Sequence, residues 1–151
     1  MNKADTCRIG PLVFGADAII AEFVRQRLKN APDSFGPCTA IGVIRSEKLA
    51  GGVVYFDYDP KIPACQVAFA FDDPRWATKH VLRSVCNYPF LQLGCLRVSA
   101  VIARKNKRSR KMVERIGFKL EGVIRKGFVT EDAMLYGLLR PECRFLEENN
   151  G

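Results

Sequence analysis

The sequence predicts a single α/β domain whose mixed, mostly antiparallel sheet contains one central parallel pair of strands. Strand-length apolar segments recur along the chain, and two of them, 64–71 and 95–102, are separated by a segment with helical periodicity. Such a strand–helix–strand unit pairs its strands in parallel, whereas the short turns elsewhere join antiparallel strands. No repeat, low-complexity tract or linker divides the 151 residues, so residues 1–151 are expected to form one domain, with 143–151 as a frayed tail.

The first half of the chain is expected to form a helix and an antiparallel meander. Apolar residues at helical spacing predict a helix over 17–28, which the run Asn30-Ala31-Pro32 ends. Pro11 has no backbone donor and therefore places the opening strand at a sheet edge. The strands expected in this half are 7–14, 38–45, 49–58 and 64–71.

The second half adds two helices and a final hairpin. A helix is expected over 76–93, where Pro89 should kink or shorten the last turn. The next helix is expected over 106–116, with Asn106 as its cap and Gly117 as its end. The remaining strands are expected at 95–102, 118–125 and 133–140.

Strand 64–71 has two different faces, because side chains alternate along a strand. One face is bulky, with Val67, Phe69 and Phe71, and suits a core. The other is small, with Ala68 and Ala70. The small face accommodates either a closely packed helix or something thin that lies along the strand.

Composition narrows the function classes. The chain is 48% hydrophobic and 26% charged, as in ordinary globular proteins. It has no apolar run near the roughly 18 residues that span a membrane and no recognisable signal peptide. Six cysteines without a CxxC pair indicate reduced core thiols, and a single histidine, His80, supports no metal site. A cytoplasmic location is therefore expected.

The positive charge is concentrated in one segment. Between Arg104 and Lys126 there are ten basic and two acidic residues, a balance that equals the net charge of +8 of the whole chain. Three interpretations remain open: a stripe that binds a nucleic-acid backbone, one wall of a pocket for a phosphorylated ligand, or a solvated helix face. Helix N-termini favour the pocket, because their unpaired N–H groups bind anions, and the turn after strand 64–71 adds Arg75 and Lys79.

The second half of the sequence carries an ordered set of motifs. A strand LRVSAVI is followed by Asn106, Ser109, Gly117-Phe118, Glu121-Gly122 and Arg125. This set resembles the GNAT superfamily of N-acetyltransferases over about residues 38–144. Within it, the sequence is most similar to the type that acetylates the N-termini of ribosomal proteins and to short relatives encoded by bacteriophages.

The resemblance implies a GNAT fold in which acetyl-CoA lies between two splayed parallel strands, here 64–71 and 95–102. The pantetheine arm would pair with the first strand and the pyrophosphate would lie on the next turn, so the basic segment would face phosphates. The cofactor-binding residues so implied are Phe69, Ala70, Phe71, Arg75, Trp76, Ala77, Thr78, Lys79, Asn106, Ser109 and Arg110.

The sequence departs from the family pattern in the pyrophosphate turn. The family places glycines there so that the backbone can approach the phosphates, but DPRWATKH contains none. Ala77 is small enough to replace one glycine. Trp76 is either a phosphate neighbour or part of the core at the start of the helix.

A second departure concerns the proton chemistry. Where many family members carry a tyrosine, this chain has Val113, which cannot donate a proton. Ser109, one helical turn earlier, is the candidate partner of the leaving thiolate, unless it only satisfies a backbone group. Asp57 and Glu121 are the candidate bases, each with a structural or solvated role as the alternative.

The sequence therefore predicts direct acetyl transfer from acetyl-CoA to a primary amine, either a protein N-terminus or a small amine. The acceptor pocket is expected between the first helix, residues 29–37 and the turn 126–132. The alternative is a catalytically degenerate GNAT module that contacts nucleic acid through residues 104–126, a binding mode that would depend strongly on salt. Neither a membrane partner nor a metal is expected, and the oligomeric state stays open.

Overall fold

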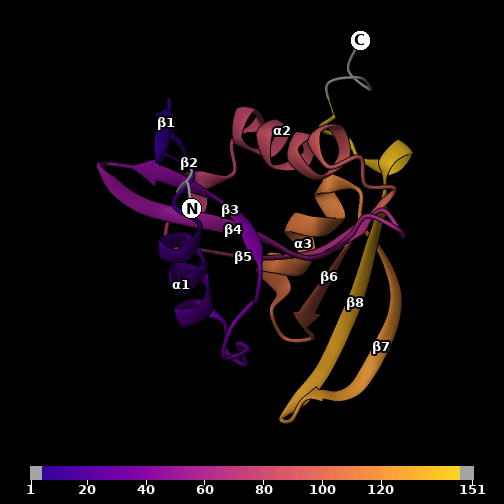
Figure 1. The fold of residues 1–151 in the computed structure, drawn as a ribbon. Coiled ribbons are helices and arrows are strands. Elements are labelled where there is room, and N and C mark those ends of the chain that lie inside the picture. The colour runs from indigo at the N-terminus through magenta and orange to yellow at the C-terminus, as the bar shows by residue number, and fades with distance from the viewer. Residues whose placement is uncertain (1–4, 147–151) are drawn as a thin grey trace.

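In the computed structural model, which describes residues 5–146, eight strands form one sheet in the order β1-β2-β3-β4-β5-β6-β8-β7. The strands are β1 (Cys7–Ile9), β2 (Leu12–Phe14), β3 (Cys38–Arg45), β4 (Lys48–Asp59), β5 (Ala64–Phe71), β6 (Arg97–Ala103), β7 (Lys119–Phe128) and β8 (Glu131–Leu139). The α-helices are α1 (Asp17–Arg27), α2 (Lys79–Asn87) and α3 (Lys107–Ile116). Figure 1 shows α1 on one side of the sheet and α2 and α3 on the other.

The sheet opens at its only parallel pair within the described residues. β5 and β6 are paired from Ala64 with Arg97 to Gln66 with Ser99, and no further. Beyond that point β4 still holds β5 as far as Phe71, and β8 holds β6 as far as Ala103. The two strands therefore diverge as the arms of a V, and the predicted mixed sheet with a splayed parallel pair is confirmed.

Helix α1 packs unusually close to the sheet. It covers β3, β4 and β5, and its Ile20 and Val24 are buried with Ala70 of β5. A Cβ atom added at Gly52 of β4 would lie 2.8 Å from Cγ2 of Ile20, so a larger residue there would force the side chain of Ile20 to move. The small face of β5 therefore accommodates a closely packed helix at Ala70, whereas Gln66 and Ala68 of the same face also line a cavity.

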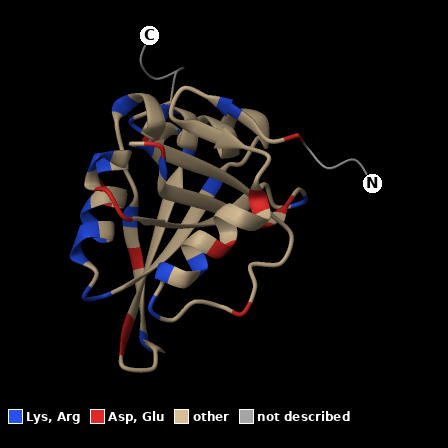
Figure 2. Cartoon of the chain, turned by 90° about the vertical axis from the view of Figure 1, so that its left-hand side faces the viewer, with Lys and Arg blue, Asp and Glu red and all other residues tan. Residues whose placement is uncertain are grey.

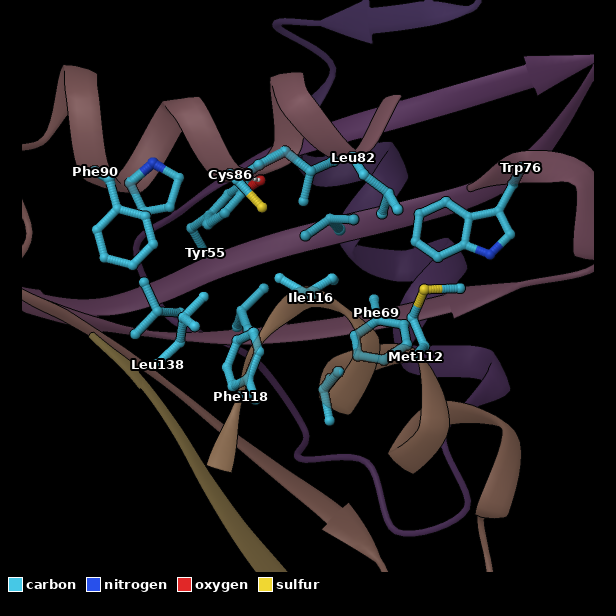
Figure 3. Close-up of a pocket in the computed structure, with 16 residues that line it drawn as sticks. Tyr55, Phe69, Trp76, Leu82, Cys86, Phe90, Met112, Ile116, Phe118 and Leu138 are labelled. Carbon is cyan, nitrogen blue, oxygen red and sulfur yellow. Dashed lines mark hydrogen bonds between the residues drawn. The ribbon is translucent and has the colours of Figure 1, made fainter. Parts of the chain in front are cut away.

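The main core lies between the opposite face of the sheet and helices α2 and α3. Figure 3 shows its side chains around a small cavity of about 40 Å³, with Trp76 pointing toward Phe69 and Met112. Trp76 is 2% exposed, and its ring stacks on Phe71 with 5.3 Å between centroids. The hydroxyl of Tyr55 donates to the carbonyl oxygen of Val85 at 2.6 Å, which fixes α2 to β4.

The chain ends differ from the predictions. Segment 7–14 is a hairpin of two strands rather than one strand, because Gly10 takes φ +58° and turns the chain. The predicted frayed tail is wrong as far as it is described: Cys143 and Leu146 are 1% and 0% exposed and belong to the core. Apolar side chains within the tail provide this anchoring. Residues 147–151 lie outside the described part of the chain.

The helix predicted over 76–93 is divided into three pieces. Pro74–Trp76 form a 3-10 turn, α2 begins at Lys79, and Tyr88–Gln92 form a π-helical turn. The α-helix begins where the side chain of Thr78 caps it by accepting a hydrogen bond from the N–H of Val81 at 3.3 Å. Pro89 lies in the π turn, which agrees with its expected effect on the last turn.

Two further findings concern the whole described part of the chain. None of its helices is long and apolar enough to cross a membrane. Four of the six cysteines, Cys65, Cys86, Cys95 and Cys143, are buried, as expected of small core residues.

Candidate active site

A cavity of about 480 Å³ fills the space between the diverging arms of the V. Residues 66–69 of β5 line one side, and residues 101–103 of β6 line the other. Side chains between residues 27 and 35, from the end of α1 onward, also line it, as do Phe128 and Glu131 of the β7–β8 hairpin. These are the segments in which the acceptor pocket was predicted. We refer to this space as the cleft.

The N-terminus of α3 lies at the wall of the cleft. The Oδ1 atom of Asn106 accepts a hydrogen bond from the N–H of Ser109 at 3.2 Å, so Asn106 caps the helix as predicted. The cap uses only the side-chain oxygen and leaves the Nδ2 group able to donate. Ser109 is 8% exposed and also lines the cleft, so these two predicted residues are brought together.

The other predicted catalytic residues do not line the cleft. Asp57 borders a separate hollow and accepts a hydrogen bond from Nε2 of Gln66 at 2.7 Å, so it meets the cleft only through Gln66. Glu121 accepts from Nη2 of Arg97 at 2.6 Å, near the closed end of the V where Arg97 pairs with Ala64. The structure therefore brings Ser109 to the cleft without either predicted base.

Glu131, which the sequence analysis did not single out, is a carboxylate in the cleft wall. Its Oε1 atom accepts a hydrogen bond from the backbone N–H of Lys105 at 2.8 Å, and its Oε2 atom lies 3.4 Å from Nζ of Lys29. The Lys105 hydrogen bond, aided by Lys29, holds the pKa of Glu131 below its ordinary value. In a sequence, an acid in a hairpin turn ordinarily indicates a solvated side chain. Glu131 comes to lie beside Lys105 only because β6 pairs with β8.

The turn after β5 is less positive than its sequence suggests. Arg75 binds Asp73 through Nη2 and Oδ2 at 2.7 Å, and Arg27 of α1 binds Asp72 at the same distance. The Arg75 hydrogen bonds lower the pKa of Asp73 to about 2. Both acids of this turn therefore face arginines.

The remaining predicted residues of this turn have distinct positions. The indole of Trp76 lies in the core, between Phe69 and Phe71, rather than at the surface of the turn. Thr78 caps α2, and Lys79, its first residue, is exposed. Because Lys79 and His80 begin the helix, their N–H groups have no intrahelical partner, and they leave an anion-binding end at α2.

Much of the basic segment is engaged with the protein itself. Arg110 donates from Nε to the Tyr136 hydroxyl at 2.9 Å, and this hydroxyl donates to Glu114 at 3.0 Å. The guanidinium of Arg108 lies 4.5 Å from the centre of the Phe71 ring, so it bridges α3 and the end of β5. Figure 2 shows the Lys and Arg positions gathered along α3, on one side of the molecule.

Residues 13–119 match the profile of the Acetyltransferase (GNAT) domain family, which covers most of the chain. No curated protein matches the sequence significantly.

Solved structures share the fold at low sequence identity. A mutant of the spermidine/spermine N-acetyltransferase SpeG from Vibrio cholerae is 15% identical, with a TM-score of 0.62 over 69% of this chain and 68% of that one. A chimera of SpeG from Vibrio cholerae and hSSAT is also 15% identical, with a TM-score of 0.67 over 87% and 97% of the two chains. A structure described as "Probable acetyltransferase" is 22% identical, with a TM-score of 0.65 over 91% and 98%.

Proposed function

Since the chain belongs to the acetyltransferase (GNAT) domain family and is an N-acetyltransferase, we propose that acetyl-CoA enters the cleft between β5 and β6 and that a primary amine attacks it there. The observation that carries this proposal is the loss of pairing after Gln66 and Ser99. It leaves the inner edge of β5 without a strand partner, beside a cavity of about 480 Å³. The amide groups of a pantetheine arm have the spacing and polarity to take the place of the missing strand.

The phosphates of the coenzyme are assigned to the two helix N-termini. The first N–H groups of α2, at Lys79 and His80, suit a pyrophosphate even though no glycine precedes them. On the opposite arm, Arg108 reaches the end of β5, and the exposed Lys107 adds charge near the same opening. In this proposal the basic segment is one wall of a coenzyme site.

Asn106 and Ser109 are proposed to serve the reacting end. The free Nδ2 group of Asn106 can donate to a pantetheine carbonyl while Oδ1 remains engaged in the cap. When the neutral acceptor nitrogen attacks the thioester carbon, the carbon–sulfur bond breaks and the Ser109 hydroxyl can donate a hydrogen bond to the departing thiolate. The nitrogen then passes its extra proton to water, and the product is an amide. No covalent enzyme intermediate is required.

Two classes of acceptor are compatible with this chemistry. The sequence motifs resemble enzymes that acetylate protein N-termini, whereas a structural neighbour acts on spermidine and spermine. The cleft favours the small amine, because its lining includes the side chains of Phe35, Phe56 and Phe128, together with Leu28, Lys29, Asn30 and Pro32. We therefore propose a small aliphatic amine as the acceptor.

The proposal is tested by thermal unfolding with acetyl-CoA, CoA and dephospho-CoA, beside a short DNA duplex at two salt concentrations. A ligand at one hundred times its Kd stabilises the folded state by about 2.7 kcal/mol, which raises the Tm of a domain of this size by about 5–10 °C. We expect acetyl-CoA to produce this shift and removal of the 3′-phosphate to reduce it. If no coenzyme shifts the Tm while DNA shifts it at low salt, the proposal is wrong, and the basic segment binds nucleic acid.

A further inference from the structure

Glu131 is the only charged side chain that is buried within residues 5–146, and it lies in the wall of the cleft. Its side chain is 5% exposed. A buried carboxylate is costly unless other groups neutralise it and donate hydrogen bonds to it. The partners of its two carboxylate oxygens therefore indicate which kind of ligand the cleft can bind.

One oxygen of Glu131 is held firmly. Oε1 accepts the backbone N–H of Lys105, whose neighbour Arg104 donates its own N–H to the carbonyl oxygen of Asp132 at 3.0 Å. Glu131 begins β8 and Lys105 lies two residues beyond the end of β6, so the contact stands at the end of the β6–β8 ladder, whose last pair is Ala103 and Ala133. The carboxylate is thus oriented by the sheet and does not depend on any mobile side chain.

The other oxygen has a weaker partner. Nζ of Lys29 lies 3.4 Å from Oε2, longer than the 2.7–2.9 Å usual for a charged hydrogen bond. Lys29 has a 65% exposed side chain and follows the end of α1, outside any helix or strand. This ammonium can therefore leave Oε2 without disturbing the fold.

We propose that Glu131 is the residue that binds the charged nitrogen of the acceptor, and that Lys29 occupies this position until the acceptor replaces it. The inference rests on the proposed function, and it specifies the acceptor class as aliphatic amines that enter as cations. The charged head takes the place of Nζ at Oε2, and the stem contacts the aromatic wall made by Phe35, Phe56 and Phe128. Neutral and anionic compounds cannot replace the ammonium group of Lys29 at Glu131 and therefore bind poorly.

The experiment uses the Lys105 amide as a reporter, because its N–H donates directly to Glu131. Uniformly ¹⁵N-labelled protein is titrated with n-butylammonium chloride; n-butanol, which has the same stem but no charge, and sodium chloride serve as probe controls. The variants are Glu131→Gln, which keeps an oxygen for Lys105, and Lys29→Met. Lys119→Met is the matched control, since Lys119 also pairs with a glutamate, Glu142, but does not line the cleft.

We expect n-butylammonium to shift the Lys105 amide resonance saturably, with a Kd at least fivefold lower in Lys29→Met and unchanged in Lys119→Met. Glu131→Gln should abolish the response while its spectrum keeps the dispersion of a folded protein. An equal response to n-butanol, a response that survives in Glu131→Gln, or no response in any folded variant would overturn the assignment of Glu131. An unchanged Kd in Lys29→Met would overturn the role of Lys29.

Acetyl-CoA added to the same samples separates this inference from the proposed function. Shifts of the amides of residues 67–71 report coenzyme binding between β5 and β6. If acetyl-CoA produces none while n-butylammonium still moves Lys105, the proposed function fails and the cation site stands. If acetyl-CoA shifts residues 67–71 and the amine leaves Lys105 unmoved, the proposed function stands and this inference fails.

Discussion

The N-terminus of α3 lines the cleft and that of α2 follows the end of β5, and the charges at the two helix ends are arranged differently. Before α2, Asp72 and Asp73 are paired with Arg27 and Arg75, so the turn offers mainly backbone N–H groups. The first turn of α3 contains no acid of its own, and Lys107 and Arg108 extend along an exposed helix face. Just before the helix, the acid Glu131 accepts a hydrogen bond from the N–H of Lys105. A phosphate at α2 would be held chiefly by amides, and one at α3 chiefly by side chains.

A charged run in a sequence is therefore not the same as free charge in the fold. Arg27 and Asp72 are 45 residues apart in the chain and meet only because α1 packs against the end of β5. Arg110, in the middle of the basic run, is used within the protein to position Tyr136. Substitutions at the two helix ends test this difference.

Replacing Trp76 by Ala should cause the largest loss of stability, because Trp76 is 2% exposed and anchors the turn before α2 in the core. Removal of a buried aromatic side chain costs about 3–5 kcal/mol, which lowers the Tm by about 10 °C or more. Thermal and urea unfolding measure the loss, and Trp76→Phe, which retains a ring, should lose less. If Trp76→Ala instead changed the stability little and weakened coenzyme binding tenfold, Trp76 would be a ligand contact.

Replacing Asn106 separates its two roles at α3. Asn106→Ala removes the cap and should lower the free energy of unfolding by about 1 kcal/mol. The same variant should also bind the coenzyme more weakly. Asn106→Asp keeps an oxygen for the N–H of Ser109 but loses the donor, so stability should persist while acetyl-CoA affinity falls. The measurements are Tm without ligand and Kd by calorimetry. An Asp variant that binds acetyl-CoA like the wild type would show that Asn106 only caps the helix.

These residues also show what the sequence could predict. Asn106 and Gly117 are local signals, and α3 begins and ends where they indicate. The alternating face of β5 correctly indicated its core side. The position of Trp76, the burial of Leu146 and the approach of Lys29 to Glu131 depend instead on contacts between distant segments, which no local pattern contains. Asp57 and Glu121 each lie within a register shift of their strand, which changes where their side chains point and which strand order alone does not reveal.

Removing charge from the outer face of α3 should have a moderate effect on binding and little effect on stability. We expect Lys107→Gln combined with Lys111→Gln to weaken acetyl-CoA binding about threefold at low salt, and less at high salt, because exposed charges are screened. Both side chains are exposed, so the Tm should change little. Arg25→Gln, which removes a cation from α1 outside the cleft, is the control; an equal loss in that variant would indicate a general effect of net charge.

The smallest expected effect concerns acid stability at the turn before α2. The hydrogen bonds from Arg75 lower the pKa of Asp73 from 3.8 to about 2, so the folded state favours its charged form. This contribution is fully present above the ordinary pKa and is lost as the pH falls from about 4 toward 2. Asp73→Asn keeps an oxygen for the backbone N–H of Arg75 and removes only the charge.

The free energy of unfolding of both proteins should therefore be compared by urea titration between pH 6 and pH 2. We expect a small advantage of the wild type near pH 6 that disappears toward pH 2, because Arg75 is 67% exposed and exposed ion pairs contribute little. A constant difference at all pH values would mean that Asp73 acts through its shape rather than its charge. In that case the paired acids before α2 would not explain why its N-terminus differs from that of α3.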